Sequence, residues 1–216
     1  MDVKVLAFYL PQFHEIPENN DVWGKGFTEW TNVKKANPLF LGHNQPRVPL
    51  NDNYYCLDDD EVMVRQIELA KKYDIYGFCF YHYWFRGKKI LEKPLERMLA
   101  NEKANIPYCF AWANEAWTKT WHGAGGEKEV FLRQTYGTYN DWKEHYEYLK
   151  NFFCDPNYIK INNKPVFLIY KINNMRHRSE MLECFNELAK MDGFDGVFCI
   201  QMLSNESPKS QLRWIN

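Results

Sequence analysis

Five near-continuous hydrophobic runs, separated by segments with helical periodicity, constrain the fold of this 216-residue chain most strongly. Antiparallel strands with one solvated face would alternate apolar and polar residues, whereas parallel strands covered on both faces are apolar throughout. We therefore expect parallel strands over residues 3–10, 75–81, 109–113, 165–170 and 196–200.

Helices are expected between these strands. The segments 91–100, 139–153 and 179–190 carry apolar residues at helical spacing, and another helix is expected after the acidic run at 58–61. A D-x-D metal site is the alternative reading of that run, but acidic residues before a helix favour capping. Alternating strands and helices indicate an α/β fold.

A (β/α)8 TIM-type barrel accounts for this pattern better than a nucleotide-binding sheet. No glycine-rich phosphate loop follows any strand, and polar and aromatic residues stand at almost every strand end, where barrels place their sites. Barrels usually need about 250 residues, and about five βα units are found here. We expect residues 1–216 to form a single domain, the N-terminal portion of a barrel truncated at its C-terminus.

Composition narrows the class of protein. Aromatic residues make up 17% of the chain, with eight Trp and fourteen Tyr, and such side chains favour wet binding surfaces. A net charge of -1 argues against a nucleic-acid partner. No apolar run reaches the roughly 20 residues of a transmembrane helix.

The six cysteines lack the spacing of a zinc site, and no H-E-x-x-H is present, so no metal is expected. We expect the cysteines to be small buried residues in a reducing compartment. The predicted location is the cytoplasm, with a peripheral position at the inner membrane through partners.

The segment YCFAWANEAWTKTW at 108–121 is the strongest candidate for a site. Its apolar run stops at Asn114 and Glu115, and Trp117 follows closely. Indole faces can cover the C–H faces of sugar rings, while amide and carboxylate groups bind hydroxyls. The alternative is a strand end whose tryptophans pack in the core.

Long blocks of the sequence resemble the glycoside hydrolase family 99-like proteins, and more closely the WbsX-type group of bacterial surface-polysaccharide biosynthesis. The blocks are AFYLPQFHEIPENNDVWGKGFTEWTNVKKANPLFLGHNQPRVPL, YGFCFYHYWFRGKKILEKPLE, PYCFAWANEAWTKTWHG and KPVFLIYKI. The resemblance implies a barrel that acts on glycans. Members are commonly labelled glycosyltransferases, and the hydrolase relatives are endo-acting α-mannosidases and mannanases.

By this resemblance, the family's catalytic acidic pair belongs to a later N-E-W-like block beyond Asn216. The chain would then carry the substrate-cleft half, with these candidate binding residues: Tyr9, Gln12, Glu29, Trp30, His82, Trp84, Asn114 and Trp117. Glu115 is the candidate catalytic carboxylate within the chain, with hydroxyl binding or a structural salt bridge as alternatives. For His82 and Glu29, a structural role is the alternative.

The function expected from these observations is glycosidic bond cleavage in a bacterial surface polysaccharide, an O-antigen or capsule, by acid/base carboxylates without a cofactor. Two alternatives stay open: a glycosyltransferase of lipopolysaccharide or capsule biosynthesis, and a non-catalytic glycan-binding module. The expected partners are a glycan substrate and other polysaccharide-assembly enzymes.

Overall fold

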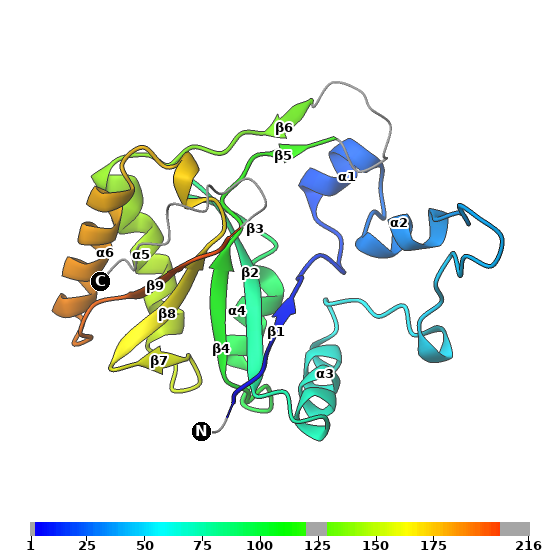
Figure 1. Cartoon of the computed structure of the whole chain (residues 1–216), viewed down its shortest axis with the longest axis horizontal. Coiled ribbons are helices and arrows are strands. Elements are labelled where there is room, and N and C mark those ends of the chain that lie inside the picture. The colour runs from blue at the N-terminus through cyan, green and yellow to red at the C-terminus, as the bar shows by residue number, and fades with distance from the viewer. Residues whose placement is uncertain (1–2, 120–128, 204–216) are drawn as a thin grey trace.

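The computed structural model describes residues 3–119 and 129–203 (Figure 1). Its main sheet contains five parallel strands in the order β1 (Leu6–Tyr9), β2 (Gly77–Phe85), β4 (Tyr108–Trp112), β8 (Lys164–Ile169) and β9 (Phe198–Gln201). All five predicted strands and their parallel pairing are confirmed. Short antiparallel strands, β3 (Lys88–Ile90) and β7 (Lys160–Ile161), extend the sheet beside β2 and β8, and a separate hairpin joins β5 (Trp117–Thr118) to β6 (Val130–Leu132).

The four predicted helices are present as α3 (Asp60–Lys72), α4 (Lys93–Ala100), α5 (Tyr139–Phe153) and α6 (Arg178–Met191). Asp59 caps α3 by accepting a hydrogen bond from the Glu61 amide, as expected for the acidic run. Thr138 forms a capping box with Asp141 at the start of α5. Gly193 follows α6 with φ of 88°, a left-handed conformation that ends the helix.

Two short helices in the first connection, α1 (Pro17–Trp23) and α2 (Glu29–Lys35), were not predicted. Glu29 and Trp30 therefore lie in a helix, in a part of the chain where the sequence predicted no element. Each of these helices has only seven residues, too few to show a helical period in the sequence.

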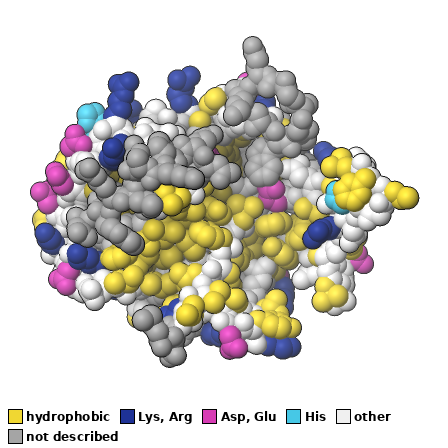
Figure 2. Space-filling model, viewed as in Figure 1, with side chains coloured by type: hydrophobic (Ala, Val, Ile, Leu, Met, Phe, Trp, Pro, Cys, Tyr) yellow, Lys and Arg dark blue, Asp and Glu magenta, His cyan; other side chains and the backbone are white. Residues whose placement is uncertain are grey.

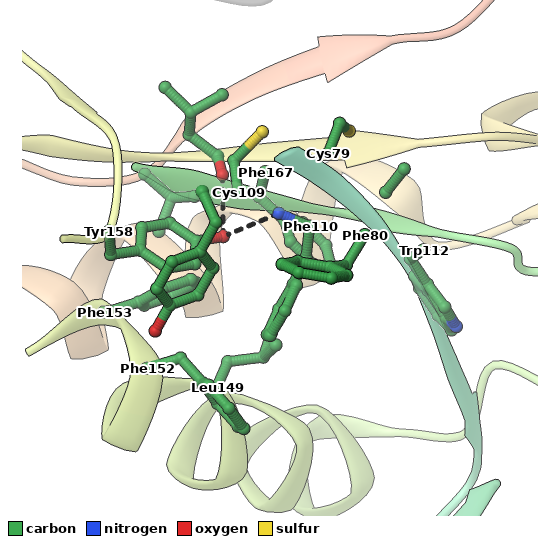
Figure 3. Close-up of a cluster of buried hydrophobic side chains, with 14 of the residues drawn as sticks. Cys79, Phe80, Cys109, Phe110, Trp112, Leu149, Phe152, Phe153, Tyr158 and Phe167 are labelled. Carbon is green, nitrogen blue, oxygen red and sulfur yellow. Dashed lines mark hydrogen bonds between the residues drawn. The ribbon is translucent and has the colours of Figure 1, made fainter. Parts of the chain in front are cut away.

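The core lies between the sheet and the helices α3, α4, α5 and α6. Alternate residues of the strands point to this side, and aromatic rings dominate it: Phe110 packs on Phe152 of α5, and Phe167 packs on Phe185 of α6. Figure 3 shows Phe110, Phe152 and Phe167 with Tyr158. The Tyr158 hydroxyl donates to the Val166 carbonyl at 2.8 Å and accepts from the Phe110 amide at 3.2 Å.

The other face of the sheet is apolar and partly uncovered. Phe8 of β1 is 55% exposed although its ring stacks on Tyr81. Figure 2 shows hydrophobic side chains gathered in a broad area over the strands on the side facing the viewer, with α4 and α5 lying behind the sheet in Figure 1. The described strands form an open sheet with β1 and β9 at its edges, and they do not close into a barrel.

The expectation that the cysteines are buried needs correction at two positions. Cys56 and Cys154 are exposed, whereas the strand residues Cys79 and Cys109 are buried as expected. No helix within the described ranges is long and apolar enough to cross a membrane.

A pair of histidines is enclosed in the core. His82 of β2 and His145 of α5 are 3% and 1% exposed, and their Nε2 atoms lie 2.9 Å apart. Burial lowers the pKa of His82 to about 3, and burial together with the neighbouring His82 lowers the pKa of His145 well below its usual value. Both rings are therefore neutral at physiological pH, with one nitrogen donating to the other.

This pair should make the fold acid-sensitive. Because the folded-state pKa values lie below the unfolded value of 6.5, stability is complete above pH 6.5 and is lost as the pH falls toward about 3. We expect about 2–4 kcal/mol to be lost between pH 7.5 and pH 5. Replacing both residues, His82→Phe with His145→Phe, should remove most of this loss in urea unfolding. The exposed control His177→Gln should keep it, and an unchanged slope in the double variant would contradict the assignment.

Candidate functional site

A pocket of about 430 Å³ lies at the carboxyl ends of the parallel strands. Gln12 reaches it from the segment after β1, Tyr81 and Tyr83 from β2, Glu115 from the segment after β4, and Tyr170 from the end of β8. Helices α1 and α2 and the β5–β6 hairpin supply the remaining walls. The strand ends thus converge where the sequence predicted a site.

The length of β2 brings two tyrosines into the pocket. This strand continues to Phe85 because its last residues pair with β3, in the register Tyr83 to Ile90 and Phe85 to Lys88. Tyr83 is buried, and its hydroxyl accepts a hydrogen bond of 3.0 Å from the Gln12 amide. This contact joins the segment after β1 to β2.

A tight connection between α1 and α2 positions Glu29. Gly26 has φ of 85°, and its amide donates to the carboxylate of Glu15 and to the side-chain oxygen of Asn20, each at 3.1 Å. Thr28 then begins α2 through a capping box with Thr31. Glu29 is consequently the first residue of α2, only 8% exposed, and it lines the pocket.

The β5–β6 hairpin supplies aromatic surface. Trp117 of β5 packs edge-on against Tyr83, with ring centroids 5.3 Å apart. The ring centroid of Phe131 of β6 lies 6.0 Å from that of Trp117. Trp117 remains partly exposed within the pocket. A partly exposed indole beside polar groups is suited to cover the apolar face of a ring ligand.

The two carboxylates of the pocket have different surroundings. Burial raises the pKa of Glu29 to about 7, and a contact with the Asn32 side chain partly offsets that rise. Glu115 lies at an exposed position of the same pocket. Near neutral pH, Glu29 can thus donate or accept a hydrogen bond. Among the described residues, no group of three or more His, Cys, Asp or Glu side chains is placed to hold a metal ion.

The structure brings together Gln12, Glu29, Glu115 and Trp117, all of which line the pocket. Their roles in binding and catalysis stay predictions. The other predicted site residues do not line it.

His82 and Trp84 lie inside β2, and the expectation that they follow the strand was wrong. Side chains alternate along a strand, so these residues point to the opposite face from Tyr81 and Tyr83. Both are buried against α5, where the Trp84 ring stacks on His145 at 4.7 Å. They belong to the core.

Tyr9 shares this orientation, because its ring packs on Phe78 and Phe80 and its hydroxyl donates to Gln66 of α3. Trp30 also lies away from the pocket. Its indole packs against Tyr55 and donates to the Tyr55 carbonyl at 2.8 Å.

Asn114 acts as a connection between strand ends. It is fully buried, its amide nitrogen donates to the Lys171 carbonyl at 3.0 Å, and its oxygen accepts from the Lys171 amide at 2.6 Å. These bonds use the side chain that was expected to meet a sugar hydroxyl. Asn114 thus holds the segment after β4, which carries Glu115, against the end of β8.

Several lining residues were not singled out from the sequence as site residues. The alternation of side chains along β2 could have identified two of them, because Tyr81 and Tyr83 alternate with the core residues Phe80 and His82. Other lining residues come from short elements and their neighbours, for which no periodic signal exists, among them Asn19, Trp23, Phe27 and Phe131.

Comparisons with known proteins agree on a family. The family model described as Glycosyltransferase WbsX matches residues 5–214. Two curated relatives named Uncharacterized protein WxcX, from Xanthomonas campestris pv. campestris strains B100 and ATCC 33913, are each 41% identical over 171 residues, which is 79% of this chain. The chain spans about a quarter (24%) of the length of these relatives.

Solved structures with a similar fold include a GH99 endo-alpha-mannosidase from Bacteroides thetaiotaomicron, with a TM-score of 0.51 and 16% identity. The match covers 95% of this chain and 57% of the mannosidase chain. A glycoside hydrolase-like protein gives a TM-score of 0.55 at 14% identity, over 96% of this chain and 53% of the other. At these identities the likeness shows the fold alone.

The raised pKa of Glu29 predicts that its carboxylate costs stability. The folded-state pKa, about 7, lies above the unfolded value of 4.5. The loss of folding stability is therefore small below pH 4.5, grows as the pH rises from 4.5 to about 7, and is complete above that. Glu29→Gln should therefore stabilise the protein by about 1–3 kcal/mol at pH 8 and by less than about 1 kcal/mol at pH 5. Urea unfolding at both pH values checks this, with Glu68→Gln on the exposed face of α3 as the control. Equal gains at both pH values would contradict the assignment.

Proposed function

The chain belongs to the WbsX family, and from that membership we propose that it is a carbohydrate-active protein whose pocket binds a unit of a glycan during cleavage of a glycosidic bond. The observation that carries the proposal is the convergence of Gln12, Glu29, Glu115 and Trp117 on one pocket at the carboxyl ends of the strands. In barrel enzymes, this end of the sheet holds the active site.

The lining of the pocket supports a sugar ligand. Trp117 offers an aromatic face, and Gln12, Glu29 and Glu115 offer acceptors and donors for hydroxyl groups. A volume of about 430 Å³ lies within the usual range of small-molecule sites. We assign Gln12, Glu29 and Trp117 to substrate binding.

Glu115 is assigned the proton-handling role within this part of the protein. Glycoside cleavage requires a pair of carboxylates, one to protonate the leaving oxygen and one to act on the anomeric carbon or on water. In this proposal Glu115 assists the acidic pair that the family resemblance implies, or binds a hydroxyl beside it. No cofactor takes part in this proposal.

Glycosyl transfer is the second candidate, favoured by the description of the family as glycosyltransferases. The acceptor or substrate in either case would be a bacterial surface polysaccharide, handled in the cytoplasm together with other assembly enzymes. A non-catalytic glycan-binding module is the third candidate, because the pocket could bind without reaction.

Binding should depend on Trp117. Trp117→Ala removes the exposed indole face, and we expect oligosaccharide affinity measured by calorimetry to fall at least about tenfold. Tyr73→Ala, which removes an exposed ring at the end of α3, should leave affinity unchanged. Equal affinity of the Trp117 variant and the unaltered protein would remove the pocket from the proposal.

Turnover separates the candidates. The natural protein is incubated with manno-configured oligosaccharides alone. A separate incubation contains nucleotide sugars, and the products of both are identified by mass spectrometry. Cleavage without a nucleotide sugar is the expected result. Products formed only with a nucleotide sugar would favour transfer, and binding without any product would favour the binding module.

A further inference from the structure

The charges around the pocket are unbalanced. Its ionisable side chains are the carboxylates of Glu29 and Glu115 and the phenols of three tyrosines, and none of its described lining residues is Lys, Arg or His. The ammonium of Lys171 contacts the Tyr170 ring at 5.1 Å, but Lys171 does not line the pocket. The described walls are thus negative or neutral.

Neither carboxylate is neutralised by an ion pair with a described residue. The salt bridges of the described chain involve other acids, for example Asp141 with Arg86 and Glu18 with Lys88. Glu29 has the neutral Asn32 side chain beside it. Glu29 is buried, so little solvent screens its carboxylate from a charge that enters the pocket, whereas Glu115 is at an exposed position.

The charges of both carboxylates affect the phenol of Tyr83. Burial raises the pKa of the Tyr83 phenol, and the negative charges of Glu29 and Glu115 raise it further. Tyr83 lines the same pocket as these two residues and accepts the Gln12 hydrogen bond. An anionic ligand group at this position would meet the same repulsion as the tyrosinate.

We propose that the pocket selects uncharged, hydroxyl-rich sugar units and excludes units that carry a carboxylate or phosphate, with Glu29 and Glu115 as the source of the discrimination. The inference rests on the proposed glycan-binding function and adds the class of sugar. Hydroxyl groups can donate to both carboxylates, whereas a uronate or a phosphate ester offers only acceptors and negative charge. Like charges placed together at an interface repel each other and disfavour the charged ligand.

A matched pair of ligands tests the charge alone. Oligosaccharides of mannose, glucose and galactose are each compared with the same compound oxidised at C6, which replaces the primary alcohol by a carboxylate. Calorimetry at pH 8, above the raised pKa of Glu29, should show the oxidised form of the preferred sugar binding at least about tenfold more weakly.

The double variant Glu29→Gln with Glu115→Gln should reduce this ratio to less than about threefold, because it removes both charges and retains the shape of the side chains. If the double variant does not give a cooperative melt, Glu115→Gln alone, at an exposed position, should still reduce the ratio. Glu68→Gln, on the exposed face of α3, makes the same change of net charge as Glu115→Gln alone and should leave the ratio intact.

The outcomes are distinct. Equal binding of neutral and oxidised sugars by the unaltered protein overturns the charge selection and leaves the glycan site standing. A ratio that persists in the glutamine variants shows that other groups cause it, which also overturns the inference. If no member of any pair binds, the glycan pocket itself fails, and the inference fails with it.

Discussion

The packing of the parallel sheet against α5 and α6 is the constraint on which the rest of the molecule depends. Every second side chain of β2, β4 and β8 points toward the helices, where rings such as Phe110 and Phe167 are fully buried. Truncating one buried phenylalanine in such a layer costs about 3–5 kcal/mol. Because strand residues alternate, this packing also decides which side chains face the opposite side.

The pocket follows from where the strands end. β2 extends further than β4 because the last residues of β2 pair with β3. Tyr83 therefore lies beyond the point at which β4 ends. The segment after β4 is then held by Asn114 against Lys171, which fixes the direction of the chain toward Glu115 and Trp117. Asn114, which the sequence offered as a sugar-binding residue, thus uses its side chain in a structural contact.

The sequence was sufficient for the strands and the longer helices, because run length and helical period are local properties. It identified Gln12 and Glu115 as neighbours, since parallel strands release their ends at one edge of the sheet. It misplaced His82 and Trp84, because an aromatic run such as FCFYHYWF does not mark where a strand stops. The positions of Trp30 and Tyr9 depend on contacts with Tyr55 and Gln66, residues distant in the sequence, which no local pattern contains.

The surroundings of two sets of buried ionisable groups distinguish structure from function. His82 and His145 are closed off from solvent and satisfy each other as neutral rings, so their burial is part of the packing. Glu29 opens onto a pocket, with a neutral amide beside it and no described cation as a partner. A residue that lowers stability without contributing to packing is best explained by what enters the pocket, since functional groups commonly oppose the stability of the fold that holds them.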